Sequence, residues 1–489
     1  MMRQKTPRAQ IAPVTAGVIA VIALTTSMTW AERKPAPPRL DLTKEGAANL
    51  VLAVPAAAEG RRPNVVMIMA DDLGYNDLGC YDHPKIKTPV LDGLAKEGIR
   101  LTSFYSGATV CTPSRMALLT GAYAWRTGWT QGVVGFRMPK GEGMSPEALT
   151  IAEVFQSAGY ATAISGKWHV GDNEASRPHR QGFESTYYIA RSNNQTTELY
   201  RADEVVEKPF KNALLTEQFT KDAIRFIEEK GGKPFFLYVP YTAPHFPVQA
   251  HPKWKGSSDF GEYGDVVEEM DFRIGEIVEA LRARKVYQDT IVIFMSDNGP
   301  ETRQAARSTP YRGLKWSALE GANRVPCIIR WEGKIPAGQV SDALVGAIDL
   351  LPTLCRASGI DLKTASTGSP VIDGVDVWPT LTGKKDGPSR DEQMFWHGMG
   401  RFDAIRSGDW KLFVNREGAA IQNKEDSDEM NAKVRALGRG KAPALFNLAE
   451  EPEELTDLSA KHPERVKEMQ ALAGKRLSEI RSKVIPLVK

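Results

Sequence analysis

Apolar runs of strand length alternate along the chain with longer stretches that have helical spacing. The runs at 64–70 ("NVVMIMA"), 161–168 ("ATAISGKW"), 234–240 ("PFFLYVP") and 290–299 ("TIVIFMSDNG") are largely apolar before their last positions. Strands that are apolar on both faces are typical of a parallel sheet that helices cover on both sides. The pattern therefore predicts an α/β fold with a largely parallel central sheet.

The stretches between these runs place apolar residues at intervals of three and four, which is the spacing of an amphipathic helix. They lie at 88–98, 149–160, 216–232 and 265–284. The first and third of them close on glycine, which is a common stop signal for a helix. We expect one further strand at 99–105 ("IRLTSFY").

The pattern of predicted elements changes after about residue 377. Short segments there read as antiparallel strands, and a helical segment follows them: 393–400, 402–414, 442–451 and, as the helix, 463–485. The sequence therefore predicts a catalytic domain at 63–376 and a smaller α+β subdomain at 377–489.

The N-terminus has the pattern of a secretory signal. Three basic residues within the first eight positions precede an apolar run at 11–24, and small residues follow as far as Ala31. We expect a signal peptide at 1–31 and a tether rich in Pro, Ala and charged residues at 32–62. The alternative is an uncleaved membrane anchor, because the run is just long enough to be ambiguous. If 1–31 is a cleaved signal peptide, the mature protein is exported to the periplasm or the extracellular space.

Charge and cysteine content exclude some classes of protein. The net charge is +3, and removal of 1–31, which holds three basic residues and no acidic one, leaves zero (+3 − 3). We therefore expect no nucleic acid partner, and since no other stretch is apolar enough to span a bilayer, no stable membrane partner. Four cysteines are too few for a disulfide scaffold. If Cys111 is used chemically, at most one pair can form among Cys80, Cys327 and Cys355.

Two predicted strands end in oxygen ligands. Asp71 and Asp72 follow the strand at 64–70, and Asp297 and Asn298 close the strand at 290–299. Ligands in open α/β sheets bind outside the carboxyl ends of strands, and four hard oxygen donors suit Ca²⁺ or Mg²⁺. The alternative is that each pair is a solvated turn or a helix cap. Two pairs at equivalent positions favour a metal site.

A cysteine stands where a helix is predicted to begin, in "VCTPSRMALLTG" (110–121). Pro113 suits the first turn of that helix and Gly121 its end. Cys111 would then lie at the helix N-terminus, where the helix dipole and Arg115 both favour negative charge. The alternative is a small buried cysteine that fills a gap in the core.

Four basic or imidazole side chains complete the set of candidate residues. Lys167 and His169 occupy alternate positions after a predicted strand and so are expected to face the same side. His245 lies in a proline-bounded loop after the strand at 234–240, and Lys315 lies in a loop before another apolar strand. Each alone is unremarkable. Together they suit attack on a tetrahedral oxyanion ester, which needs charge neutralisation, a positioned nucleophile and proton transfer.

Six ordered blocks of the sequence resemble the type I sulfatase family. "CTPSRMALLTG" is similar to its C-x-P-S-R signature, and the other blocks are "DDLG", "GKWH", "APHFP", "SDNG" and "RGLKWSALEGANRVP". The resemblance covers about Pro63 to Leu458. It implies an alkaline-phosphatase-like fold, with a mixed, largely parallel sheet between helices and a smaller C-terminal subdomain. It also implies that a maturation enzyme, which reads Cys111, Pro113 and Arg115, oxidises the cysteine to formylglycine.

The resemblance further implies a role for each candidate residue. Asp71, Asp72, Asp297 and Asn298 would hold Ca²⁺ or Mg²⁺ together with residue 111. Arg115, Lys167 and Lys315 would offset negative charge. His245 with Lys315 would protonate the leaving alcohol, and His169 would deprotonate a second hydroxyl of the hydrated aldehyde.

The leading hypothesis is therefore a hydrolase of sulfate monoesters, acting on sulfated sugars or aryl sulfates. The first alternative is a phosphonate monoester or phosphodiester hydrolase of the same superfamily, and the second is a non-catalytic binding protein for sulfated glycans with an unmodified Cys111. Leu314 and Trp316 are bulkier than the glycines that the family usually has beside the lysine, so we expect them to shape the pocket. Asn193, Asn194 and Arg303 are expected in loops at its rim.

Overall fold

The computed structural model describes most of the chain after residue 61. The described ranges are 62–230, 232–301, 303–362, 372–384, 389–421, 427–440 and 443–489. The expected signal peptide at 1–31 and all but the last residue of the expected linker at 32–62 lie outside the described residues. Within the described ranges, no helix combines the length and the apolar character that crossing a bilayer requires.

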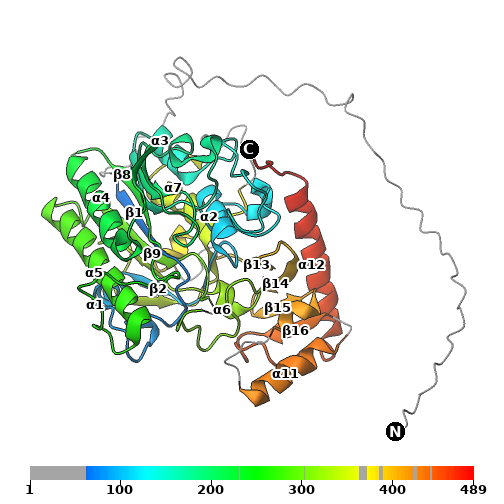
Figure 1. The fold of residues 1–489 in the computed structure, drawn as a ribbon. Coiled ribbons are helices and arrows are strands. Elements are labelled where there is room, and N and C mark those ends of the chain that lie inside the picture. The colour runs from blue at the N-terminus through cyan, green and yellow to red at the C-terminus, as the bar shows by residue number, and fades with distance from the viewer. Residues whose placement is uncertain are drawn as a thin grey trace, which may run out of the picture. The chain divides into compact units, whose positions relative to one another are not determined.

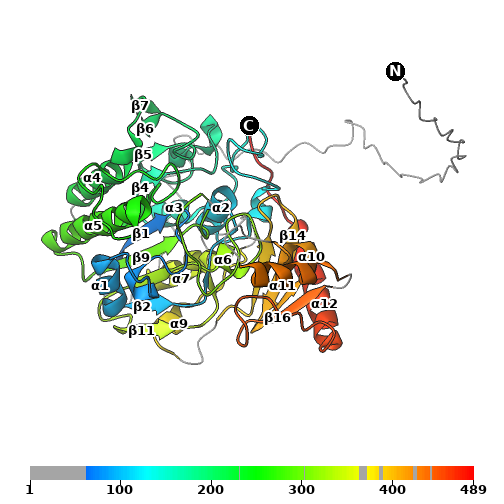
Figure 2. The ribbon, with the colours of Figure 1, turned by 60° about the horizontal axis from the view of Figure 1, so that its bottom comes forward.

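Ten strands form the central sheet, and Figure 2 shows their order, with β7 at one edge and β11 at the other. The five middle strands are parallel: β9 (Thr290–Ser296), β1 (Asn64–Ala70), β8 (Phe235–Pro240), β4 (Ala161–Lys167) and β5 (Ser185–Ile189). The flanking strands include antiparallel pairs: β10 (Cys327–Arg330), β2 (Ile99–Leu101) and β11 (Gln339–Ser341) on one side, and β6 (Leu199–Arg201) and β7 (Glu204–Glu207) on the other. The expected α/β class with a mixed, largely parallel sheet is confirmed.

Helices cover both faces of this sheet, which is why β9, β1, β8 and β4 are buried along their whole length. Figure 1 shows one layer made of α1 (Pro89–Glu97), α4 (Leu215–Glu229) and α5 (Gly261–Ala283), and the other made of α2 (Cys111–Thr120), α3 (Ile151–Ser157) and α7 (Leu350–Ala357). Along β1 the side chains alternate between two cores. Met67 packs in the core that contains α2 and α3, and Ile68 packs in the core that contains α4 and α5.

The stretch at 99–105 forms two strands, so the prediction of one continuous strand is wrong. β2 stays in the central sheet, whereas β3 (Phe104–Tyr105) pairs with β12 (Val345–Gly346) in a separate two-stranded sheet. The chain changes sheets at Thr102 and Ser103. The backbone N–H of Thr102 donates to Ser341 O at 2.8 Å, and Ser103 O accepts from Val345 N at 3.2 Å.

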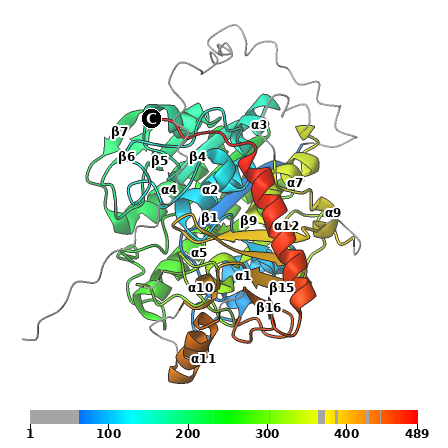
Figure 3. The same ribbon diagram turned by 90° about the vertical axis from the view of Figure 1, so that its right-hand side faces the viewer.

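The C-terminal part forms a four-stranded antiparallel sheet, as the sequence predicts for its short strands. Its strands are β13 (Glu392–Trp396), β14 (Phe402–Ser407), β15 (Trp410–Phe413) and β16 (Ala444–Asn447). The last helix, α12 (Pro463–Arg481), contacts β14 and β15 and is drawn in red in Figure 3. The division of the chain at residue 377 stays a prediction.

Short elements connect these layers. They are α6 (Glu320–Asn323), α9 (Trp378–Leu381), α10 (Arg416–Ala419) and α11 (Asp428–Gly438), with 3-10 turns at η2 (Gly79–Tyr81), η3 (Ala124–Thr127), η4 (Glu174–Ser176), η5 (Pro178–Arg180), η6 (Asn212–Leu214) and η7 (Ala347–Asp349).

A buried ionic cluster joins the C-terminal sheet to the central domain. Lys411, on β15, lies between two carboxylates, with its Nζ 2.9 Å from Glu320 Oε1 and 2.8 Å from Glu454 Oε1. All three side chains are fully buried. Glu320 opens α6, only five residues after Lys315. Burial would raise the pKa of Glu320, but Lys411, Arg406 and Arg324 together lower it to about 2.

Replacing Lys411 with methionine should destabilise the protein strongly. The change leaves two buried carboxylates without their shared cation, and breaking a buried ion pair in this way costs about 3–5 kcal/mol. The measurement is the midpoint of denaturant unfolding. The matched control is Lys433→Met on α11, where the lysine is 55% exposed and its pair with Glu429 is worth ~0.5 kcal/mol or less. Equal shifts for the two variants would contradict the prediction.

Candidate active site

The two acidic pairs meet at the carboxyl edge of the sheet. β1 and β9 are adjacent and parallel, with Ala70 opposite Ser296, so the residues that follow them emerge side by side. The backbone N–H of Asp72 donates to Asp297 Oδ1 at 3.2 Å, and Asn298 Nδ2 donates to Asp72 Oδ1 at 2.7 Å. Asp71 and these three residues are all fully buried. The solvated turns considered as an alternative are therefore absent at these four positions.

Cys111 is the first residue of α2 and lies directly above Asp71. Its Sγ is 3.3 Å from Asp71 Oδ1 and 4.0 Å from Asp72 Oδ1, and only 1% of the residue is exposed. The expectation that this position favours a negative charge is wrong for the thiol. Burial and the carboxylate of Asp71 raise its pKa far above the ordinary value, and the lysines nearby do not compensate. The unmodified side chain is thus a neutral thiol and not a ready nucleophile.

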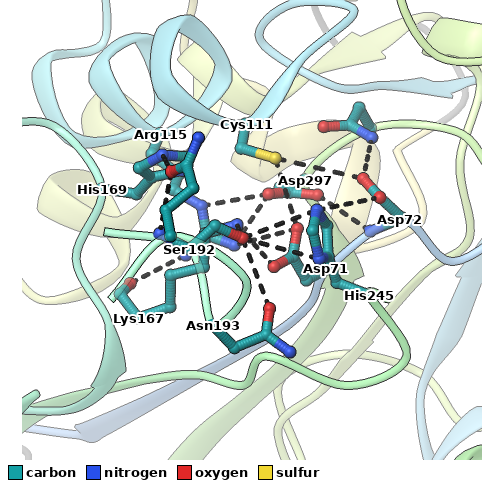
Figure 4. A network of polar contacts seen from close by, with 12 residues as sticks. Asp71, Asp72, Cys111, Arg115, Lys167, His169, Ser192, Asn193, His245 and Asp297 are labelled. Atoms are coloured by element: carbon teal, nitrogen blue, oxygen red, sulfur yellow. Dashed lines mark hydrogen bonds and ion pairs between the residues drawn. The ribbon is translucent and has the colours of Figure 1, made fainter. Parts of the chain in front are cut away.

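Three cations surround Cys111, and each holds a different carboxylate. Arg115, one helical turn after Cys111, donates to Asp297 Oδ2 from Nε at 3.0 Å and from Nη2 at 2.7 Å. Figure 4 shows this pair beside the contact of Lys167 Nζ with Asp71 Oδ2, at 2.6 Å. Lys315 Nζ lies 2.7 Å from Asp72 Oδ1 and 2.9 Å from Asp72 Oδ2. Positive charge therefore reaches the cysteine from three directions.

The buried carboxylates of Asp71, Asp72 and Asp297 repel one another. Burial would raise the pKa of Asp71, but Lys167, His245 and Arg115 together lower it well below its usual range. Burial and the negative charge of Asp71 raise the pKa of Asp297 to about 6, although Arg115 opposes the change. Burial likewise raises the pKa of Asp72 despite Lys315. A further positive charge at this place would relieve that repulsion.

The donor set fits a divalent cation of the calcium or magnesium type. Ligand atoms of Asp71, Asp72, Cys111 and His245 all lie within 4.8 Å of one another. The side-chain oxygen of Asn298 is buried and has no hydrogen-bond partner, which is a costly state for a polar atom unless a ligand completes it. Carboxylate and amide oxygens are the ligands that these hard cations prefer.

His169 lies at the site, but not by the strand alternation that the sequence suggested. β4 ends at Lys167, and His169 has φ of 59°, so its side chain does not continue the alternation of the strand. Its Nε2 lies 3.0 Å from Val134 O and 3.1 Å from Gln195 Oε1, whereas its Nδ1 is buried without a partner. Because both neighbours of Nε2 are oxygen acceptors, that nitrogen carries the proton and Nδ1 holds a free lone pair.

His245 follows β8 and lies beside Asp72. Its Nδ1 is 2.6 Å from Phe246 O, and its Nε2 is 3.6 Å from Asp72 Oδ2. The carbonyl fixes the proton on Nδ1. Burial lowers the pKa of both His169 and His245 well below the ordinary value, with nearby lysines acting in the same direction. Both imidazoles are therefore neutral at neutral pH.

The structure adds two residues that the sequence analysis missed. Ser192 Oγ accepts from Lys167 Nζ at 3.1 Å and lies 3.5 Å from the ring nitrogens of His245 (Figure 4). Gln195 contacts His169, and its Oε1 also accepts from the backbone N–H of Ser192 at 3.3 Å. Both follow β5, the next parallel strand of the sheet. The rule that sites form at the carboxyl ends of parallel strands is the signal that could have found them.

A cavity of about 420 Å³ opens above these residues. Side chains of the site form its floor and loop residues its walls: Cys111, Val133, Gly135, Phe136, His169, Ser192, Asn194, Gln195, His245, Phe246, Glu301, Arg303, Lys315 and Trp316. The expected rim residues Asn194 and Arg303 are among them, but Asn193 is not. Asn193 is buried and donates to Asn212 Oδ1 at 2.7 Å, so the prediction that it lies at the rim is wrong. Trp316 lines the cavity as expected, whereas Leu314 does not.

The chain has relatives among known proteins. A model of the family described as Sulfatase matches residues 63–360. The chain belongs to the sulfatase family. Arylsulfatase A of Homo sapiens is 33% identical over 446 residues, which cover 83% of this chain and 85% of that protein. N-acetylgalactosamine-6-sulfatase of Canis lupus familiaris is 32% identical over 391 residues, covering 73% and 72% respectively.

A solved structure agrees with the sequence relatives. The PsFucS1 sulfatase from Pseudoalteromonas sp. superposes with a TM-score of 0.76 at 26% identity, over 90% of this chain and 95% of that one. Family, relatives and fold together make the chain a sulfatase of the alkaline phosphatase superfamily, an enzyme that hydrolyses sulfate esters. All four cysteines of this sulfatase are free, so the one pair that the sequence allowed does not form.

Proposed function

We propose that this sulfatase hydrolyses sulfate monoesters of sugars or aryl alcohols at residue 111, once Cys111 has been oxidised to formylglycine. A divalent cation, Ca²⁺ or Mg²⁺, acts beside it. The observation that carries the proposal is the set of three cations on three separate carboxylates around Cys111, a residue that lines the cavity together with Lys315. Burial and Asp71 raise the pKa of the Cys111 thiol and so disfavour the thiolate, and chemical conversion of Cys111 would account for its place there.

The number of cations favours a sulfate over the alternative substrates. A sulfate monoester presents three non-bridging oxygens, whereas a phosphonate monoester or a phosphodiester presents only two. Arg115, Lys167 and Lys315 supply three separate sources of positive charge. Preorganised charge of this kind stabilises the negative charge that develops in a transition state, and it acts most strongly where water is excluded.

Formylglycine, as a hydrate, would supply two hydroxyls on one carbon, one to attack sulfur and one to make the release of sulfate intramolecular. Asp71, Asp72, Asp297 and Asn298 would hold the cation, which supplies Lewis-acid charge at the reacting oxygens. Arg115 links the two parts of the site, because it stands one turn from residue 111 and binds Asp297 in two places.

Proton transfer falls to the lysine and the two histidines. Lys315 is fully charged, since Asp72 raises its pKa well above the ordinary value even against burial. Lys315 and His245 both lie beside Asp72, and together they would protonate the leaving oxygen as its bond to sulfur breaks. His169 acts as the base, because its Nδ1 has a free lone pair while Val134 O and Gln195 fix the proton on Nε2.

Maturation and export complete the proposal. A formylglycine-generating enzyme would recognise Cys111, Pro113 and Arg115 in the order C-x-P-x-R. The signal at 1–31 would direct the chain to the periplasm or the extracellular space before it is removed. The catalytic domain at 63–376 would carry every residue named above, and the subdomain at 377–489 would support it through Lys411.

The test is a comparison of leaving-group-matched esters. We would measure kcat/KM for 4-nitrophenyl sulfate, 4-nitrophenyl phenylphosphonate and bis(4-nitrophenyl) phosphate, using protein co-expressed with a maturation enzyme. Residue 111 would be identified by mass spectrometry. We expect the sulfate to be the preferred substrate. Preference for the phosphonate or the phosphodiester would transfer the function to the alternative, and binding of sulfated glycan without turnover, with a free thiol at 111, would indicate a non-catalytic protein.

A further inference from the structure

Trp316 has a backbone conformation that favours glycine. Its φ is 80°, a region that residues with a bulky side chain rarely adopt. Hydrogen bonds hold this conformation on both sides of the residue. Its backbone N–H donates to Thr109 O at 3.0 Å, and its carbonyl accepts from Gly398 N at 2.9 Å. Strain of this kind persists where the surrounding structure enforces it, and it concentrates at functional sites.

The surroundings of Trp316 fix the indole ring as well as the backbone. Gly398 lies so close to the ring that a Cβ at that position would stand 2.4 Å from Trp316 Cε3. Phe136 packs edge-to-face on the indole, with the ring centroids 5.8 Å apart. The backbone N–H of Gly132, in the loop that carries Phe136, donates to Gly398 O at 2.8 Å. Two separate loops thus hold one aromatic side chain in place.

The indole is the aromatic surface that the cavity offers to a ligand. Trp316 is only half-buried, and it lines the cavity together with Lys315, the cation that binds Asp72. Each of the other two aromatic rings of the cavity wall has an arginine guanidinium over it. Phe246 stacks with His245 at 4.5 Å and lies under the guanidinium of Arg303 at 4.3 Å. Arg137 lies over the ring of Phe136 at 5.5 Å.

We propose that Trp316 is a specificity-determining residue, a platform for the leaving alcohol, with Phe136 as its support. The platform selects sulfate esters whose alcohol has a flat apolar face, namely an aryl ring or the C–H face of a sugar ring. This inference rests on the proposed function. Sulfate binds beside residue 111 and Lys315, and the alcohol packs on the indole of Trp316, which lines the same cavity. Contacts between flat apolar faces and aromatic rings supply affinity without a charged partner.

The test separates the alcohol from the sulfate. In Trp316→Gly, and in Trp316→Asn, which also tolerates positive φ, we expect kcat/KM for 4-nitrophenyl sulfate to fall about tenfold, a factor that corresponds to about 1.4 kcal/mol. The inhibition constant of inorganic sulfate, which has no alcohol, should stay within about twofold. Glycine relieves the backbone strain but also removes the packing of the indole against the core, so the thermal midpoint should fall, and kcat/KM is compared at a temperature at which both proteins are folded.

The chain provides a matched control in Trp254. That residue is also half-buried and pairs with a partly exposed phenylalanine, Phe272, at a ring distance of 5.2 Å, but neither residue lines the cavity. Trp254→Gly should leave kcat/KM unchanged. The inference is overturned if Trp316→Gly keeps wild-type kcat/KM, or if the inhibition constant of inorganic sulfate rises as much as kcat/KM falls.

Failure of the proposed function would give a different result. If the matured wild-type protein hydrolysed no sulfate ester, the platform would be tested by binding alone. Calorimetry would then compare the Kd of 4-nitrophenyl sulfate for the wild type and Trp316→Gly. A tenfold weaker Kd in the variant supports the platform, and equal Kd values reject it.

Discussion

Replacing Cys111 with alanine should lower turnover of an aryl sulfate by on the order of 10⁵-fold, the scale on which enzymes respond to loss of a nucleophile. The fold should survive, because alanine keeps the first residue of α2 and the thiol makes only the two long contacts with Asp71 and Asp72. The carboxylates and the cations that hold them stay in place. The measurement is kcat of the matured protein, with thermal unfolding to confirm the fold.

Cys355→Ala is the matched control for this change. Cys355 is also 1% exposed and lies on a helix, α7, but it does not line the cavity. Its removal should leave kcat within about twofold of the wild type. Activity that survived in Cys111→Ala would rule out the proposed mechanism, whatever the control showed.

Removing the divalent cation should have the second-largest effect. A Lewis-acid cation supplies several kcal/mol of transition-state stabilisation, so a chelator should lower kcat/KM by on the order of 10³-fold, and Ca²⁺ should restore it. The repulsion among Asp71, Asp72 and Asp297 also predicts an effect on stability. Calcium at 100 times its Kd should stabilise the folded protein by about 2.7 kcal/mol, seen as a higher thermal midpoint.

Asp72→Asn tests where the cation acts. The variant removes one of three clustered negative charges, so its thermal midpoint should respond much less to Ca²⁺ than that of the wild type. Asp77→Asn is the control, because Asp77 is equally buried in the same loop but binds Gly74 N, Tyr263 and Arg307 N instead. It should respond to Ca²⁺ like the wild type. An equal response of Asp72→Asn and the wild type would place the cation elsewhere.

Sequence reasoning located the site because its parts obey a rule of topology. The carboxyl ends of adjacent parallel strands meet at one edge of a sheet, so Asp71 and Asp297 could be brought together from two apolar runs nearly 230 positions apart. The same rule reached Lys167 at the end of β4. It needs only the strand pattern, which is strong in a chain whose middle strands are apolar on both faces.

The charge state of the site could not be predicted in the same way. The expectation of a favoured thiolate at Cys111 considered the helix dipole and Arg115, whereas burial and the nearby Asp71 decide the outcome. The positive charge of Arg115 is instead paired with the carboxylate of Asp297. Such effects depend on what lies within a few ångströms across the fold, which no local pattern reports.

Backbone conformation was the other limit of prediction. The alternation of side chains along a strand predicts that His169 faces the same side as Lys167. The strand ends at Lys167, however, and His169 itself has a positive φ. Ser192 and Gln195 lie in the loop after β5, where the topology rule predicts site residues, but only their contacts with Lys167 and His169 show which residues of that loop reach the site. Side chains on loops take their directions from tertiary contacts, and these are the places where sequence patterns fail.

Every residue of α2 is buried in the folded protein, including the three positions that a maturation enzyme would read, Cys111, Pro113 and Arg115. An enzyme cannot reach this segment without opening the core. In the proposed maturation, oxidation of Cys111 therefore competes kinetically with folding during synthesis and export. A chain that folds first keeps its thiol permanently. Two preparations with the same sequence and the same fold can thus differ in specific activity through the order of these two events.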